Sequence, residues 1–521
     1  MTFEEFDFLR SDEGRRAVQE NLAADPVAVA MRYRGPFAAA VATQVKYLQR
    51  AGGRGGAGDG VGSEVGAGAK LPSYFRAGCI IPSLAFEQSS AEAVAAARTY
   101  SGGLCIDLTC GLGVDAFCLS RRFGRVVAVE RDPLLAAVAR YNFSLLGADN
   151  IEVIEGSAEE FLAALAGEAD VAATSRAATQ DCAVPGGADC GVRSVAFASL
   201  ALLLRASAVQ ASSTALGLAS FRPGLTACAA QALAAPFSLS PLSATTLTAG
   251  GPLADLIFVD PDRRGASGEK LYKLEDCSPD VVSLMPLTRS LAEVVAVKCS
   301  PLFDVDRARA LFGEGTLCEA VSWGGECKEV LIETGGRRVG EHIADERLAV
   351  PRAVPRAVSR IRATAVGRGS VVFDAARPTA VAPPLPDFLS VALSGAPLTT
   401  SGTLYLTIPD VALQKARCAA EYFSGLGAFI ESDNGFALHS AILDTKLGRS
   451  LKVVSIERFS PKKISKKLRD RGIRGIDILV RDFPLTAATI ARQLGVREGG
   501  VATFVFTRLA GEAVCIEVEK L

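Results

Sequence analysis

The chain has few of the residues that build metal sites and disulfide frameworks. Its 521 residues include only two histidines, His342 and His439, and none of its thirteen cysteines forms a Cys-x-x-Cys pair. Zinc sites usually combine closely spaced cysteine and histidine ligands, so we expect no metal. An odd number of scattered thiols is typical of a reducing compartment, and we therefore expect a cytoplasmic protein.

The chain also lacks a long apolar run and a strong net charge. The apolar stretch Val195–Leu204 ends at Arg205, far short of the roughly 20 residues that a membrane helix needs. The acidic start of the chain shows no signal-peptide pattern. A formal net charge of −1 gives no general attraction to nucleic acid, so any RNA binding must come from a local patch.

A chain of this length predicts two or three domains. Short apolar segments alternate with helical patterns from Cys105 onward, which predicts an α/β fold with a parallel, doubly wound sheet and helices on both faces. A low-charge insertion, either disordered or weakly helical or else a lid over the substrate, interrupts this pattern at 167–252. We predict an N-terminal helical cap with a Gly/Ala-rich loop at 1–75, the Rossmann-like domain at 76–335, a linker at 336–402 and a small α/β domain at 403–521.

The most informative segment is Cys105–Asp115, with the sequence CIDLTCGLGVD. It predicts a buried strand, a glycine turn at Gly111 and Gly113, and then a helix whose free N–H groups favour a polar ligand. The next predicted strand, Arg125–Val129, is followed by Glu130. An acid in that position suits the two hydroxyls of a ribose. These features predict a nucleoside-cofactor pocket at the carboxyl end of the sheet.

Two cofactors fit the glycine turn. The segment from Gly111 to Ala116 satisfies the loose form of the dinucleotide fingerprint. Asp107, however, would repel a pyrophosphate and suits the ammonium group of S-adenosylmethionine. The charge pattern therefore favours S-adenosyl-L-methionine over NAD. A third interpretation is that the glycines serve only a tight turn between strand and helix.

A second motif follows the predicted strand Leu256–Val259. Pro261 stops this strand because it has no N–H for the sheet, and the acids Asp260 and Asp262 flank it. A carboxylate there could accept a hydrogen bond from a substrate amine and orient its lone pair. Arg263 and Arg264 follow, where they could bind phosphate. The plainer alternative is a strand-end turn with solvated arginines.

Basic residues are concentrated near the end of the chain. Residues 446–481 contain twelve basic and three acidic residues, a formal charge of +9. Lys462, Lys463, Lys466 and Lys467 have the spacing of one helix face, which suits an RNA backbone. The alternative is a solvated helix face.

Taken together, the motifs resemble those of bacterial class I S-adenosylmethionine-dependent methyltransferases with a C-terminal THUMP-like domain. These proteins are often grouped with the RNA cap guanine-N2 methyltransferases. The matching motifs cover most of 76–335 and 440–521. They are Pro82 with Glu87-Gln-Ser-Ser90 and Glu92, Asp107–Asp115, Asp260–Arg264, Leu274–Asp280, Lys298–Pro301, Gly325–Val330, Val480–Leu485 and Glu498–Gly500.

The resemblance implies a methyltransferase acting on RNA, most simply at a base nitrogen. The residues expected to bind the cofactor are Asp107, Thr109, Gly111, Gly113, Asp115, Glu130, Arg131, Ser157 and Ala158, with Ser157 standing where the family has an acid. The expected catalytic residues are Asp260, Pro261 and Asp262. The expected substrate-binding residues are Arg263, Arg264, Lys298, Ser300, Lys462, Lys463, Lys466 and Lys467. Two other classes stay open: a methyltransferase for a small molecule or protein, and a non-catalytic RNA-binding protein with a cofactor fold.

Overall fold

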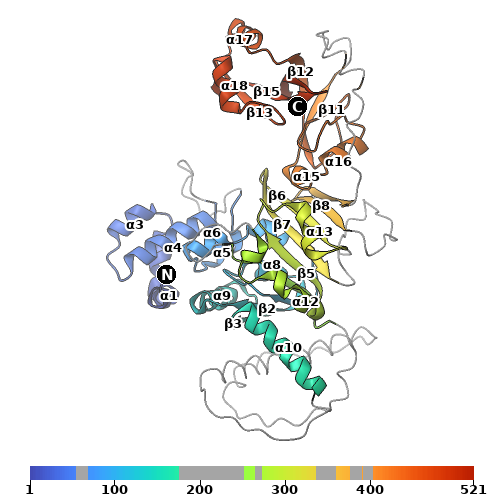
Figure 1. Ribbon diagram of the computed structural model, residues 1–521. Coiled ribbons are helices and arrows are strands. Elements are labelled where there is room, and N and C mark those ends of the chain that lie inside the picture. Colours follow the sequence, from blue (N-terminus) through green and yellow to red (C-terminus); the bar gives the residue numbers. More distant parts are fainter. Residues whose placement is uncertain are drawn as a thin grey trace, which may run out of the picture.

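The computed structural model describes residues 1–53, 68–174, 252–263, 273–335, 359–375, 386, 390 and 403–521, without the side chains of 167–174. Figure 1 shows N-terminal helices beside a large central sheet and a smaller C-terminal domain beyond the far edge of that sheet. Among the described residues, no helix is long and apolar enough to cross a membrane.

Helices form the N-terminal region, as the sequence predicts, and the first three of them have side-chain caps. Thr2 and Glu5 form a reciprocal capping box at the first helix, and Asp25 caps a helix that starts at Pro26. The side chain of buried Gln44 holds the segment between α5 and α6, because it donates a hydrogen bond to the carbonyl of Cys79 and accepts one from the N–H of Ile81. The helices are α1 (Phe3–Arg10), α2 (Asp12–Asn21), α3 (Pro26–Arg32), α4 (Ala38–Ala51), α5 (Pro72–Ala77), α6 (Ser83–Gln88) and α7 (Glu92–Ala96).

The large sheet has the strand order β3-β2-β1-β4-β5-β7-β6-β8-β9. Strands β1 to β5 are parallel, whereas β7 runs antiparallel to both β5 and β6. The order reverses between β1 and β4, and such a switch point opens a crevice at the carboxyl ends of the strands. The strands are β1 (Gly102–Asp107), β2 (Phe123–Glu130), β3 (Ile151–Glu155), β4 (Ala254–Val259), β5 (Ala292–Cys299), β6 (Leu317–Trp323), β7 (Glu326–Gly335), β8 (Arg360–Ala365) and β9 (Gly369–Asp374).

The two faces of this sheet bury separate cores. Alternate residues of β1 point to opposite sides: Cys105 packs with the N-terminal helices, and Ile106 packs with the other face. The first core takes in α8 (Val114–Ser120) and α9 (Pro133–Leu146). The second core takes in α10 (Ala158–Thr174), α12 (Val281–Leu291) and α13 (Val305–Phe312), with the short helix η2 (Leu274–Asp276) beside α12. The predicted doubly wound sheet is therefore confirmed.

The linker prediction is wrong for part of 336–402. Residues Arg360–Ala365 form β8 and Gly369–Asp374 form β9, which extend the sheet beyond β6. Sequence reasoning missed β8 because Arg362 made the segment look polar, yet Arg362 is buried and its guanidinium pairs with Glu319 and Glu333. Most of the predicted insertion lies outside the described residues, and its first part, 167–174, continues α10.

The C-terminal domain contains a second sheet with the order β11-β10-β12-β16-β15-β13-β14. Its strands are β10 (Tyr405–Pro409), β11 (Ala437–His439), β12 (Gly448–Arg458), β13 (Gly475–Val480), β14 (Arg497–Glu498), β15 (Ala502–Leu509) and β16 (Glu512–Lys520), and its helices are α15 (Val411–Lys415), α16 (Ala419–Gly425), α17 (Pro461–Asp470) and α18 (Ala487–Leu494). A small α/β domain is thus confirmed. Helix α15 packs on β6 and β8, so a common core joins the two sheets.

Candidate active site

A cavity of about 780 Å³ lies at the carboxyl ends of β1, β2, β4 and β5. Most of the predicted site residues meet there, although they come from segments up to about 190 residues apart. The predicted residues in its wall are Thr109, Gly111, Gly113, Asp115, Glu130, Arg131, Ser157, Ala158, Asp260, Pro261, Asp262, Arg263 and Ser300. Asp107 and Lys298 lie behind the wall, and Arg264 lies outside the described residues.

The two glycines of the turn after β1 serve different purposes. A Cβ atom on Gly113 would lie 2.4 Å from the ring of Phe143, and its φ of +87° disfavours other residues. A Cβ atom on Gly111 would meet nothing nearer than a backbone oxygen at 4.0 Å, although its φ of +55° is also left-handed. Gly113 is therefore required by packing, and only Gly111 leaves open space beside the cavity.

Glu130 ties the two cofactor-side loops together. Its Oε2 accepts a 2.7 Å hydrogen bond from the N–H of Gly111, and its Oε1 accepts one of 2.9 Å from the N–H of Asp132. Burial raises the pKa of Glu130, and these two bonds oppose the rise. Each carboxylate oxygen keeps a further lone pair, so Glu130 can still accept hydrogen bonds from a ribose.

Asp107 is fully buried and does not reach the cavity wall. Its Oδ1 accepts a 3.0 Å hydrogen bond from the N–H of Thr109, whereas its Oδ2 has no hydrogen-bond partner among the described residues. Burial raises the pKa of Asp107 to about 8, and the nearby acids Asp115 and Asp260 add to the rise. Asp107 therefore fixes the turn by its hydrogen bond to Thr109, and it makes no direct contact with the space that a cationic ligand would occupy.

The turn after β4 is held from three sides. Thr109 accepts a 2.7 Å hydrogen bond from the N–H of Asp260. Arg131, at the end of β2, donates to Ser278 at 2.9 Å and lies 3.4 Å from a carboxylate oxygen of Asp262. Asp262 and Ser278 also exchange backbone hydrogen bonds. Arg131 and Asp262, predicted as cofactor-binding and catalytic residues, thus also brace each other across the cavity wall.

Ser157 and Glu160 form a reciprocal cap at the start of α10. The N–H of Glu160 donates to the Ser157 hydroxyl, and the N–H of Ser157 donates to the Glu160 carboxylate, both at 3.1 Å. Both capping bonds leave Ser157 in the cavity wall, where its hydroxyl can still donate to a ligand.

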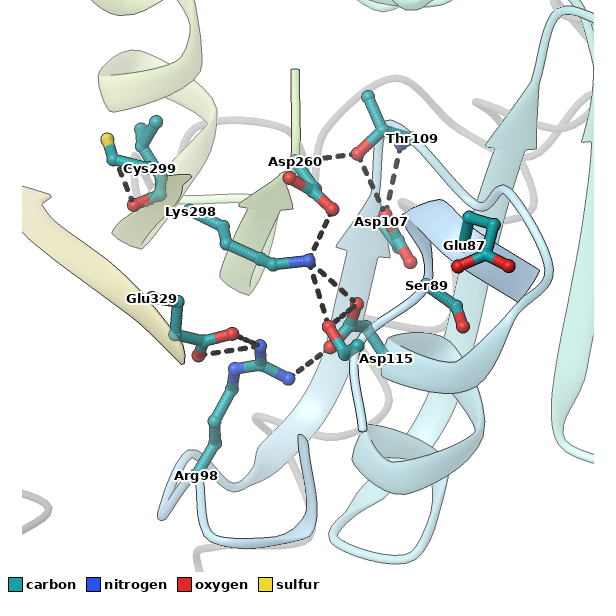
Figure 2. A network of polar contacts seen from close by, with 12 residues as sticks. Glu87, Ser89, Arg98, Asp107, Thr109, Asp115, Asp260, Lys298, Cys299 and Glu329 are labelled. Carbon is teal, nitrogen blue, oxygen red and sulfur yellow. Dashed lines mark hydrogen bonds and ion pairs between the residues drawn. The ribbon is translucent and has the colours of Figure 1, made fainter. Parts of the chain in front are cut away.

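A buried chain of alternating charges runs behind the cavity wall (Figure 2). Nζ of Lys298 lies 2.5 Å from Oδ2 of Asp260 and 3.9 Å from Oδ2 of Asp115. Asp115 pairs with Arg98, and Arg98 grips Glu329 through two hydrogen bonds of 2.9 and 3.1 Å. Asp115 was predicted as a cofactor residue, but both oxygens of its carboxylate contact side chains of this network.

Pairing sets the ionisation of the chain's central members. Burial opposes the charge of Lys298, but Asp260, Asp115 and Glu329 outweigh it and raise the Lys298 pKa. Burial likewise opposes ionisation of Asp115, but Arg98 and Lys298 outweigh it and lower the Asp115 pKa. The pKa of Glu329 is raised, because the effect of burial exceeds the opposing effect of the Arg98 charge. Lys298 is therefore a cation and Asp115 an anion at neutral pH.

Several side chains of the site were not predicted, among them Ser90, Arg98, Leu84 and Leu302. Ser90 bridges Lys298 and Asp115 through hydrogen bonds of 2.9 and 2.8 Å, and Arg98 links the helical cap to the sheet. Two leucines of the wall expose much of their surface, Leu84 at 54% and Leu302 at 76%. Ser90 belongs to a motif that carried the family resemblance, and that was the one signal available for it.

The cavity wall is strongly acidic. Among the described residues, its basic side chains are Arg131 and Arg263. Its acidic side chains are Glu87, Asp115, Glu130, Asp132, Glu159, Asp260 and Asp262. Such a wall suits a cationic ligand and disfavours a pyrophosphate. Among the described residues, no group of three or more histidine, cysteine, aspartate or glutamate side chains could hold a metal ion.

The predicted lysine face lies on α17, which Figure 1 shows at the top of the view in the C-terminal domain, whereas β2 and β3 lie in its lower half. Ile464 and Leu468 bury the inner side of this helix, whereas Lys462, Lys463 and Lys466 are exposed. Lys467 differs from them because its ammonium group contacts Ser455, Glu457 and Glu517 at 3.1 to 3.6 Å. Lys467 is therefore partly committed to holding its own domain together.

Comparisons with known proteins agree with this geometry. Residues 448–520 match the THUMP domain-like family, and residues 81–176 match the tRNA (Uracil-5-)-methyltransferase family. A solved structure of a candidate methyltransferase from Porphyromonas gingivalis W83 aligns with a TM-score of 0.62 and 20% identity, covering 97% of this chain and 96% of that one. The chain therefore has the class I S-adenosylmethionine-dependent methyltransferase fold with a C-terminal THUMP-like domain, which confirms the resemblance.

Curated relatives match only a short segment. A tRNA/tmRNA (uracil-C(5))-methyltransferase of Photorhabdus laumondii is 41% identical over 68 residues, which are 13% of this chain and 19% of that protein. The corresponding enzyme of Enterobacter sp. strain 638 is 36% identical over 87 residues, 17% of this chain and 24% of the relative. The chain thus spans less than a quarter of the length of these two relatives.

Proposed function

We propose that the protein is an S-adenosylmethionine-dependent methyltransferase that methylates a base nitrogen of RNA. The observation that carries this proposal is the placement of Asp260 at the end of β4. Its side chain is 21% exposed in the cavity wall, and its backbone and one carboxylate oxygen are fixed by Thr109 and Lys298. The other oxygen, Oδ1, makes no hydrogen bond to any described residue and is available to a ligand.

S-adenosylmethionine fits the residues of the cavity. It would supply an electrophilic methyl group on a sulfonium centre. The seven acids of the described wall suit its positive charges. Glu130 would accept the ribose hydroxyls, and open space at Gly111 would let the ligand approach the backbone.

The target base would enter from the side of Asp260. Asp260 would accept a hydrogen bond from the amine, direct the nitrogen lone pair toward the methyl group and take the proton that the amine loses, before passing it to water at the cavity mouth. No aromatic residue follows Pro261. The exposed side chains of Leu84 and Leu302 offer an apolar rim against which a flat base could pack. A base in folded RNA would have to be extruded to reach it.

Nitrogen is favoured over the C5 carbon of uracil. Methylating that carbon requires a nucleophile, normally a thiolate, to add to the ring first. Cys110 is the one cysteine in the described cavity wall; it is 5% exposed, and burial raises its pKa well above the ordinary value. The uracil-specific match ends at residue 176, before β4, so it covers the cofactor half and not the strand that bears Asp260.

RNA would be held mainly by the C-terminal domain. Lys462, Lys463 and Lys466 form no ion pair or hydrogen bond with the described residues, so their charges are free to contact phosphates. The THUMP-like match covers this helix. Arg263, in the cavity wall, and Ser300 would contact the nucleotide that flanks the target base.

Methyl transfer to RNA can be measured directly. Purified protein is incubated with methyl-labelled S-adenosylmethionine and total cellular RNA, and the product is treated with ribonuclease or protease. Label that ribonuclease releases and protease does not would support the proposal. Ribonuclease-resistant product would indicate a small-molecule or protein substrate, and RNA binding without turnover would indicate a non-catalytic RNA-binding protein.

A further inference from the structure

Four buried charged residues lie at or behind the cavity wall, and three of them, Lys298, Arg98 and Glu329, do not line the cavity. Lys298 and Arg98 are the cations, and Asp115 and Glu329 are their partners; Asp115 alone reaches the wall. The exposed fractions of the Lys298, Arg98 and Glu329 side chains are 6%, 2% and 2%. Burying charged side chains is unfavourable unless each is paired, so a buried network of this kind is weak evidence for a purely stabilising role.

The chain connects four parts of the fold to one carboxylate. Glu329 lies on β7, Arg98 follows α7, Asp115 lies on α8 and Lys298 lies on β5. All lead to Asp260, whose Oδ2 meets Lys298 at 2.5 Å (Figure 2). Arg98 is held further by the ring of Phe258, 4.8 Å away on β4. The Lys298 ammonium therefore has little freedom to move.

We infer that the chain Glu329–Arg98–Asp115–Lys298 positions Asp260, so that one carboxylate oxygen is fixed inside the protein and the other faces the target amine. This inference rests on the proposed function, because it concerns the residue that would receive the amine. Lys298 is then a positioning residue, since it acts on the substrate only through Asp260. Arg98 and Glu329 are positioning residues as well, because they act on Asp260 only through Asp115 and Lys298.

The geometry explains why a lysine is needed there. The side chain of an aspartate at a strand end can change rotamer, and a different rotamer of Asp260 would turn its oxygens away from the amine. Lys298 binds one oxygen, and Ser90 and Asp115 occupy the other sides of its ammonium group. A fixed acceptor acts in the transition state, so its loss lowers kcat more than it raises KM.

Two matched pairs of variants test the inference. The structure contains a second buried network, in which Arg362 pairs with Glu319 and Glu333 away from the cavity wall. Lys298→Met is compared with Arg362→Met, and the milder Glu329→Gln with Glu319→Gln. We expect Lys298→Met to lower kcat at least about tenfold and Glu329→Gln about threefold, with KM for RNA within about threefold of the parent in both. The control variants should lose stability and keep the parent kcat.

A second measurement needs no substrate. The carboxyl carbon of Asp260 is followed by ¹³C NMR in aspartate-labelled protein and assigned by its absence in Asp260→Asn. Its resonance should move in Lys298→Met and Glu329→Gln and stay in place in Glu319→Gln. An unmoved resonance, or an active Glu329→Gln with the parent kcat, would overturn the inference. A parent protein that does not methylate RNA would contradict the proposed function alone, because the NMR comparison would still decide the positioning role.

Discussion

The N–H of Gly111 donates a 2.7 Å hydrogen bond to Oε2 of Glu130, so the turn after β1 is bound to the end of β2. The two elements that would hold the cofactor cannot move independently. The pocket is thus assembled before any ligand arrives, which lowers the entropic cost of binding.

Glu130→Ala should therefore weaken the binding of S-adenosylmethionine by at least about tenfold, or roughly 1.4 kcal/mol. It removes both the acceptor for the ribose and the bond that fixes Gly111. Titration calorimetry measures the change. Glu152→Ala, on the neighbouring strand β3 and outside the cavity wall, is the matched control and should leave the affinity unchanged.

Alanine substitutions at Gly113 and Gly111 should affect different properties, the first mainly the stability of the fold and the second mainly cofactor binding. Gly113→Ala would bring a methyl group into the ring of Phe143 on a left-handed backbone, so we expect a loss of about 2–5 kcal/mol in the free energy of unfolding. Gly111→Ala meets no close atom and should lose only about 1–2 kcal/mol, from its left-handed backbone. It should weaken cofactor binding nevertheless. Urea unfolding measures the stability of each variant, and titration calorimetry measures its affinity for the cofactor. A Gly113→Ala protein as stable as the parent would contradict the packing role of Gly113.

Asp107 should make the protein without cofactor less stable as the pH rises. Its pKa is near 3.8 when unfolded and about 8 when folded. Below pH 4 both states are protonated; between pH 4 and 8 the unfolded state is ionised and the folded state is not, so rising pH favours unfolding. The loss of thermal stability from pH 5 to pH 8 should be smaller in Asp107→Asn than in the parent.

The exposed Asp149 provides the comparison for this test. Asp149→Asn changes the same chemical group without burial and should reproduce the pH dependence of the parent. An Asp107→Asn protein with that same dependence would show that Asp107 is ionised in the fold.

The lysines of α17 should act on RNA and not on the cofactor. Reversing the charge of Lys462, Lys463 and Lys466 should weaken RNA binding and reduce the slope of log affinity against log salt by about 2, at roughly 0.7 per phosphate contact. Filter binding at several salt concentrations measures this. Lys467→Glu should lower stability instead, because it breaks the contacts with Glu457 and Glu517.

Charge reversal of Arg16 and Arg32 on the N-terminal helices serves as the control for α17. Both side chains are exposed, and neither lies on the C-terminal domain. If this control changes RNA affinity as much as the lysine variant does, the C-terminal domain is not the principal RNA-binding surface.

Local signals in the sequence were sufficient for much of the fold. The glycine turn, Glu130 and the Asp260-Pro261 stop lie at strand ends, and parallel strands bring their carboxyl ends to one edge. Such features depend on neighbouring residues and on the direction of the strands.

Long-range pairing could not be predicted in the same way. Arg98 and Glu329 are 231 residues apart, and nothing near either residue indicates the other. Arg362 looked like a linker residue because its partners, Glu319 and Glu333, lie on other strands. The mutual support of Arg131 and Asp262 was hidden for the same reason.

The central claim is that Asp260 receives a base nitrogen of RNA. The most direct measurement is mass spectrometry of the nucleosides in RNA that has been incubated with S-adenosylmethionine and either the parent protein or Asp260→Ala. The parent should produce a nucleoside methylated on nitrogen, and Asp260→Ala should produce about 100-fold less while binding the cofactor within a few-fold of the parent. Formation of 5-methyluridine, or an equal yield from Asp260→Ala, would contradict the account.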